Sequence, residues 1–196
     1  LNRKVAIVED SNFECPVLID IFTVSGKSEH TLDLPFYFKG QLIGANFTYK
    51  RHLDSQQVFG DENGYQHLWL EAEGKSDLPV SSLTFLNGNR FYSLTTNVTP
   101  ETELFLTRIG ANDPNFNLRN DQMYMLRDHN KSERTYVTIL EPHGEFNPIK
   151  EYTVSSYPKI KNIEIVDNKR DSSTLILNLT SGGSVKIEIG NRKDSM

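Results

Sequence analysis

The residues best suited to bind a polar ligand are Arg108 and several residues of the segment that follows it, residues 109–119, which reads Ile-Gly-Ala-Asn-Asp-Pro-Asn-Phe-Asn-Leu-Arg. The amides of Asn112 and Asn115 and the guanidinium groups of Arg108 and Arg119 suit an oxygen-rich molecule, because arginine can grip a carboxylate through two parallel hydrogen bonds. Gly, Pro, Asn and Asp at this density cannot continue a strand, and Asx side chains can cap their own backbone. The segment is predicted to be either a binding loop or an ordered surface connection.

A second candidate is the aromatic stretch at residues 65–73, interpreted as a strand. Alternate residues of a strand share a face, so Tyr65, His67 and Trp69 are expected on one side of it. Such a face could stack against sugar rings, which makes His67 a candidate substrate-binding residue. It could equally be the inner face of a sandwich core, or, together with Phe91 of the neighbouring hairpin, an apolar surface for a partner domain.

The sequence contains no recognisable catalytic or metal-binding motif. Its five histidines show no ligand spacing typical of zinc, and no nucleophile elbow, phosphate-binding glycine loop or dinucleotide fingerprint is present. We therefore assign no catalytic residue, no metal ligand and no cofactor site to this chain.

Length and composition describe a polar chain that can bury a core. It has 196 residues, of which 37% are hydrophobic, and a net charge of −5. No basic cluster appears, which argues against a nucleic-acid partner. No apolar run is long enough to span a membrane, so no membrane partner is expected. Since the chain opens at Leu1 and leads at once into alternating residues, we expect an excised piece of a longer protein or a mature form.

The hydrophobic pattern predicts an all-β fold, an antiparallel β-sandwich of about a dozen strands, in a single domain over residues 1–190 with a flexible tail at 191–196. Short apolar-alternating runs are separated by turn-forming residues throughout. Turns are predicted at residues 25–28, 87–89 and 181–183, and a polar break at 128–133. The last three runs, at 160–166, 174–179 and 185–189, alternate as a sheet with one solvated face should.

Several longer motifs, kept in order, give the chain a family resemblance. It resembles the C-terminal part of oligo-alginate lyases, which belong to the heparinase II/III-like polysaccharide lyases. The similarity runs from about residue 4 to residue 144 and continues more weakly to the end. The motifs are Pro-Val-Leu-Ile-Asp-Ile-Phe from Pro16, His-Thr-Leu-Asp-Leu-Pro-Phe-Tyr-Phe-Lys-Gly-Gln from His30, Gly-Tyr-Gln-His-Leu-Trp from Gly64, Asn-Gly-Asn-Arg-Phe-Tyr-Ser from Asn87 and Gly-Ala-Asn-Asp-Pro-Asn-Phe-Asn-Leu-Arg from Gly110.

The resemblance implies an N-terminal α/α toroid in the same parent chain, a substrate cleft between the two parts and a uronate-containing oligosaccharide as substrate. It also implies a periplasmic or secreted location. The family's catalytic Asn, His and Tyr and its zinc ligands precede the matched stretch, so none is carried over, and the chain alone is expected to be inactive. The alternative is a free-standing carbohydrate-binding or structural β-module.

Overall fold

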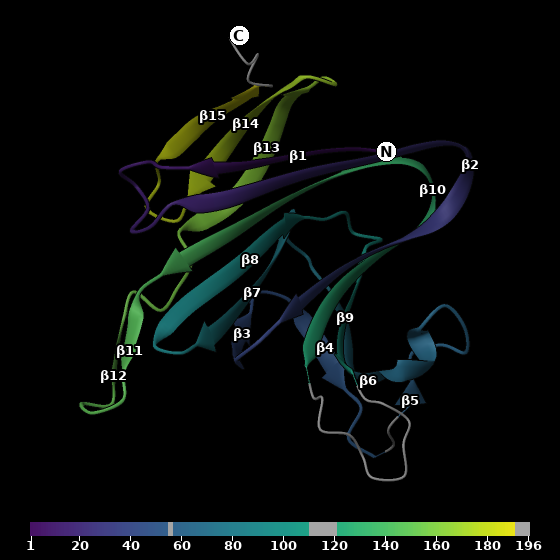
Figure 1. Ribbon diagram of the computed structural model, residues 1–196, viewed down its shortest axis with the longest axis horizontal. Coiled ribbons are helices and arrows are strands. Elements are labelled where there is room, and N and C mark those ends of the chain that lie inside the picture. The colour runs from purple at the N-terminus through teal and green to yellow at the C-terminus, as the bar shows by residue number, and fades with distance from the viewer. Residues whose placement is uncertain (55–56, 110–120, 191–196) are drawn as a thin grey trace, which may run out of the picture.

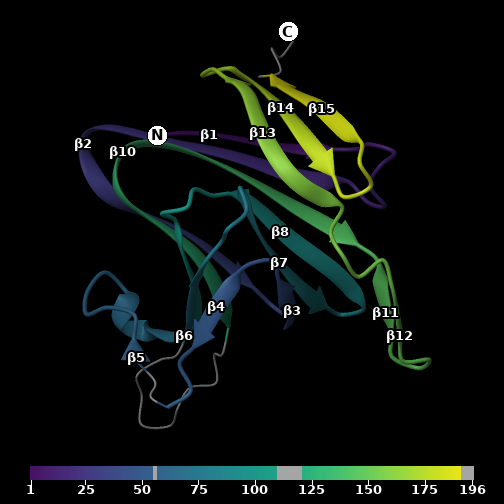
Figure 2. The same ribbon diagram turned by 180° about the vertical axis from the view of Figure 1, so that it is seen from behind.

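The computed structural model describes residues 1–54, 57–109 and 121–190, and these residues form an all-β protein with one short 3₁₀ turn. Figures 1 and 2 show its strands from the two sides. The strands are β1 (Asn2–Val8), β2 (Val17–Phe38), β3 (Gln41–Ala45), β4 (Thr48–Arg51), β5 (Gln57–Val58), β6 (Leu68–Lys75), β7 (Val80–Asn87), β8 (Arg90–Asn97), β9 (Glu103–Ile109), β10 (Gln122–His143), β11 (Glu145–Asn147), β12 (Tyr152–Val154), β13 (Ile160–Asn168), β14 (Ser172–Leu179) and β15 (Ser184–Gly190). The 3₁₀ turn, η1 (Tyr65–His67), precedes β6.

Two 22-residue strands, β2 and β10, form the spine of the largest sheet. They pair antiparallel along their length. On the other edge of β10, β9 pairs with its first part and β8 pairs with its last part. Beyond these, β1 pairs with β2, β7 joins β8 and β3, and β6 joins β9, β4 and β5, so the sheet has ten antiparallel strands. The predicted antiparallel all-β fold is confirmed.

The predicted turn at 25–28 and the predicted break at 128–133 are wrong, because both stretches lie inside the two long strands. The β2–β10 ladder bends there and shifts register between Asp128 and Lys131 and again between Lys131 and Glu133. Gly and Ser inside a strand can mark a bulge or bend as well as a turn.

A buried carboxylate holds this bend. Asp128 is fully buried and accepts hydrogen bonds from Thr102 Oγ1 at 2.6 Å, Arg134 Nε at 3.0 Å and Tyr136 Oη at 2.9 Å. Arg134 also donates from Nη2 to the carbonyl oxygen of Asn97 at 2.9 Å. These donors offset the burial of the Asp128 carboxylate, and its pKa is held below the usual value.

The sandwich arises where the sheet of β13, β14 and β15 packs on one face of β1, β2 and the second half of β10 (Figure 2). The shared core includes Ile19 and Ile21 from β2, Val137 and Ile139 from β10, and Leu175 from β14. The alternating burial of β14 and β15 matches the predicted one-sided strands. The opposite face of the large sheet curls around a second core that contains Leu83, Leu104, Tyr124 and Leu126.

Two of the predicted hairpins are present. Gly88 follows β7 with φ +60° and Gly182 follows β14 with φ +95°, and glycine takes positive φ without strain. Within the described residues, no helix is long and apolar enough to cross a membrane.

Candidate functional site

Of the predicted substrate-binding residues, Asn112, Asn115 and Arg119 lie outside the described residues, while Arg108 and His67 can be placed. Arg108, in β9, is the rung partner of Trp69 in β6 and of Gln122 in β10. Its Nε atom lies 2.7 Å from a carboxylate oxygen of Glu71, and about a third of its side chain is exposed. His67 is exposed and ends the turn just before β6. Both residues therefore lie at the same end of the β6–β9 ladder.

The predicted shared face of Tyr65, His67 and Trp69 is wrong, because the first two residues belong to the 3₁₀ turn and not to a strand. Gly64, with φ +89°, begins that turn, and β6 starts only at Leu68. Phe91 does not extend an exposed surface either, because it is buried against the ring of His143.

Tyr65 instead completes a closed cation–aromatic cluster. Its hydroxyl donates to Asp33, which also accepts hydrogen bonds from Nε and Nη2 of Arg127, each at 2.7 Å. The Arg127 guanidinium lies 4.5 Å from the centroid of the Phe59 ring and 5.5 Å from that of Phe105. With its charge paired and its faces covered, Arg127 is a structural group that fixes the 59–67 segment on the sheet.

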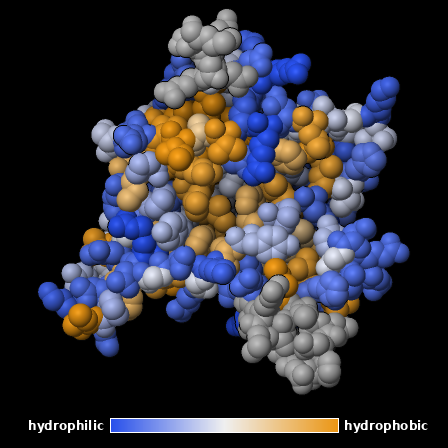
Figure 3. Space-filling model, viewed as in Figure 1, coloured by the Kyte–Doolittle hydropathy of each residue, from blue (hydrophilic) through white to orange (hydrophobic). Residues whose placement is uncertain are grey.

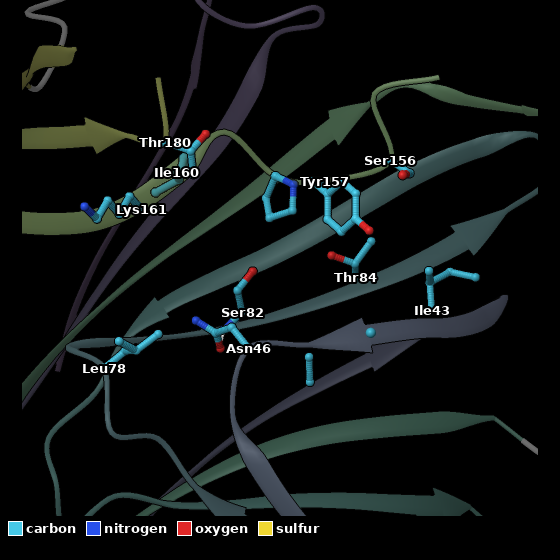
Figure 4. Close-up of a pocket in the computed structure, with 13 residues that line it drawn as sticks. Ile43, Asn46, Leu78, Ser82, Thr84, Ser156, Tyr157, Ile160, Lys161 and Thr180 are labelled. Carbon is cyan, nitrogen blue, oxygen red and sulfur yellow. Dashed lines mark hydrogen bonds between the residues drawn. The ribbon is translucent and has the colours of Figure 1, made fainter. Parts of the chain in front are cut away.

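A groove of about 460 Å³ opens between the large sheet and the segment that leads into β13 (Figure 4). It is lined from β3 and β7 on one side and from residues 156–161 on the other. The lining residues are Ile43, Gly44, Ala45, Asn46, Leu78, Ser82, Thr84, Ser156, Tyr157, Pro158, Ile160, Lys161 and Thr180. Its volume falls in the range of small-ligand sites.

The walls of the groove are apolar and largely open to solvent. Tyr157 is 84% exposed, and its ring lies above Thr84 in Figure 4, while Leu78 and Ile43 lie toward opposite ends. Large apolar side chains exposed around a concave surface are typical of a binding site rather than of a solvated turn.

The floor is polar because the hairpin of β7 and β8 places hydroxyl side chains opposite each other. Ser82 pairs with Thr95 and Thr84 pairs with Ser93, with oxygen–oxygen distances of 3.1 and 2.7 Å. Ser93 Oγ is also 2.9 Å from Nε2 of the buried His143. Hydroxyls from two strands thus form two hydrogen-bonded pairs beneath the groove, and one of these pairs continues to His143.

Two buried titratable side chains of β10 hold the segment at residues 155–159, which leads into the upper wall of the groove, against the large sheet. His143 Nδ1 is 2.7 Å from the carbonyl oxygen of Ser155, and both carboxylate oxygens of Glu141 accept from the backbone N–H of Lys159 at 3.1 Å. Burial raises the pKa of Glu141 to about 7 and lowers the pKa of His143. His143 is therefore neutral near pH 7.

Our sequence interpretation missed this groove, although part of its signal is visible. The stretch 80–96 alternates Ser and Thr with apolar residues around Asn87 and Gly88, so a two-residue turn would set the hydroxyls face to face. Nothing local indicates that Tyr157 would lie above them.

Comparison with known proteins finds homologues of this chain. No family model matches the chain. It is 31% identical over 197 residues to an exo-oligoalginate lyase of Saccharophagus degradans, an alignment that covers 98% of this chain and 26% of that protein. It is 32% identical over 187 residues to an alginate lyase of Stenotrophomonas maltophilia, covering 95% of this chain and 25% of that protein. The chain is thus homologous, over almost its whole length, to about a quarter of two alginate lyases.

Proposed function

We propose that this chain is the C-terminal β-sandwich domain of an alginate lyase of the heparinase II/III-like superfamily, whose parent protein cleaves oligouronates by β-elimination. The observation that carries the proposal is the match over 98% of this chain to 26% of an exo-oligoalginate lyase. In the proposed parent, the domain packs on an N-terminal α/α toroid and completes the substrate cleft.

An uncovered apolar face supports the packing role. The three-stranded sheet covers one face of β1 and β2, and the other face carries Val5 and Ile7, which are 57% and 73% exposed. On β2, Leu18 is the half-buried rung partner of Ile7, and Phe22 is half-buried beneath Arg3, which forms an ion pair with Asp20 on the same face. Figure 3 shows apolar areas on this side of the molecule, separated by hydrophilic residues. Exposed apolar surface of this kind is typical of a protein interface.

β-Elimination from a uronate needs three groups: a cation or donors that neutralise the C5 carboxylate, a base for the C5 proton and an acid for the leaving oxygen. We propose that this chain contributes substrate-binding groups, namely Arg108, His67, Asn112, Asn115 and Arg119. The Glu71 ion pair would hold Arg108 in a fixed orientation. The base and the acid would come from the remainder of the parent, and we expect the chain alone to be inactive.

The test is the ultraviolet absorbance of the unsaturated uronate product. The full-length parent incubated with alginate trisaccharide should turn over on the order of 10 times per second, while mannotriose, which has no C5 carboxylate, should give no signal. An Ile7→Asp variant should place a charge in the proposed interface with the toroid and reduce lyase activity. The control, Val166→Asp on β13, also changes an exposed apolar residue and should leave the activity unchanged. Absence of any alginate cleavage by the parent would refute the proposed function.

The runner-up, a carbohydrate-binding module, draws support from the groove with its exposed Tyr157. The intact mass of the protein isolated from its source separates the two, because a lyase parent would be several times heavier than 22.4 kDa. We also propose a periplasmic or secreted location, which cell fractionation would test.

A further inference from the structure

The groove between β3, β7 and residues 156–161 combines an aromatic wall, a hydroxyl floor and a lysine. Together these features suit a ligand that has an apolar face, hydroxyl groups and a negative charge. We propose that it binds one uronate ring of an oligouronate, as a carbohydrate site of this domain in its own right. The choice of a uronate over another anionic sugar rests on the proposed function, whereas the site itself rests on the geometry below.

The walls suit the C–H faces of a pyranose. Tyr157 presents an exposed ring from one side of the groove, and Ile43 and Leu78, also exposed, present aliphatic surface from the other (Figure 4). A pyranose ring has one or two faces made mainly of C–H groups, which pack on aromatic and aliphatic side chains while the hydroxyls point sideways. A ring held this way would have its edge directed at the floor.

The hydrogen bonds that connect Thr84, Ser93 and His143 determine which donors and acceptors the floor presents to a ligand. The Ser155 carbonyl can only accept, so Nδ1 of neutral His143 carries the proton and Nε2 accepts from Ser93 Oγ. Ser93 has then used its one proton, so Thr84 must be the donor in the Thr84–Ser93 contact. Thr84 Oγ1 is left with acceptor capacity toward the groove.

Asn46 supplies the matching donor. Its Oδ1 accepts from the backbone N–H of Ser82 at 2.6 Å, and its Nδ2 donates to the carbonyl oxygen of Val80 at 3.2 Å. These contacts fix the amide orientation and leave one of its two N–H groups without a partner among the described residues. An acceptor on Thr84 and a donor on Asn46, both on the floor, suit adjacent sugar hydroxyls, each of which can donate and accept.

The positive charge at the groove favours an acidic sugar over a neutral one. Lys161 is exposed at one end of the groove, and none of the thirteen lining residues is Asp or Glu. The groove therefore presents a local positive charge on a protein whose net charge is −5. It complements a C5 carboxylate at the end of a bound ring.

Isothermal titration calorimetry of this chain, which has its own cores and is expected not to cleave the ligand, measures this site through its binding stoichiometry for trimannuronate. Tyr157→Ala should lower the stoichiometry by one site or weaken that site at least about tenfold, the scale of a lost aromatic contact. Lys161→Gln should weaken trimannuronate at this site and leave the weaker binding of mannotriose unchanged. Tyr152→Ala and Lys186→Gln, at exposed residues that do not line the groove, are the matched controls.

Lyase turnover of the full-length parent, followed by ultraviolet absorbance in a separate assay, distinguishes this inference from the proposed function. Loss of one site in Tyr157→Ala supports the groove even if the parent proves to have no lyase activity. Unchanged stoichiometry and affinity in Tyr157→Ala overturn the groove even if the parent is an active lyase. A lowered melting temperature with unchanged binding also overturns it, because Tyr157 would then stabilise the fold without contacting the sugar.

Discussion

Replacing Glu141 with Gln tests whether a buried carboxyl group makes the fold sensitive to pH. Glu141 is 1% exposed, and its pKa is raised from 4.5 to about 7, chiefly by burial. The folded state keeps the Glu141 proton up to a higher pH than the unfolded state does. Glu141 therefore contributes stability that is fully present below pH 4.5 and is lost as pH rises through 7. Each pKa unit corresponds to about 1.36 kcal/mol, so about 2–3 kcal/mol disappears between pH 5 and pH 8.

The measurement is urea unfolding followed by fluorescence of Trp69, the single tryptophan, at pH 5 and pH 8 for the wild type and Glu141→Gln. The wild-type free energy of unfolding, minus that of the variant, should fall by about 2–3 kcal/mol across this range. The subtraction removes the contribution of His143, which is present in both proteins. Because the pKa of His143 is lowered, its contribution to the free energy of unfolding changes with pH in the opposite direction. Glu188→Gln is the control, because the exposed Glu188 has its pKa lowered by Lys186 and does not titrate in this window. A difference that stays constant within about 0.5 kcal/mol, or grows with pH, would refute the reasoning.

Two further predictions concern the framework of the large sheet. In Gly40→Ala, the new Cβ would lie 2.1 Å from the carbonyl oxygen of Leu86, at a residue with φ +118°. We expect a loss of about 2–5 kcal/mol in urea unfolding, whereas Gly44→Ala, with no atom within 4 Å of the new Cβ, should change stability by less than about 0.5 kcal/mol. Asp128→Asn should cost about 3–5 kcal/mol, because it leaves the charge of Arg134 largely buried and unpaired. The double variant with Arg134→Met should recover much of that loss, and strictly additive losses would contradict the proposed pairing.

The sequence by itself determined the class of fold and much of the local pattern. Alternation of apolar residues identified β14 and β15 and their buried faces, because a strand's side chains alternate with a period of two whatever it pairs with. Gly88 and Gly182 marked turns, because positive φ is a property of the residue itself.

Only the tertiary structure decided which strands pair, and therefore what the sites contain. A local pattern assigns residues to faces but does not specify a partner, so Ser25–Gly26 and Asp128–Glu133 resembled turns, although they form the paired bend of β2 and β10. The 3₁₀ turn at Tyr65 likewise depends on Asp33 and Arg127, which are distant in sequence. The groove requires Tyr157 and Thr84, which are far apart in sequence, to line the same cavity, and the direction of its hydrogen bonds depends on His143. Burial and long-range contacts of this kind are properties of the folded chain alone.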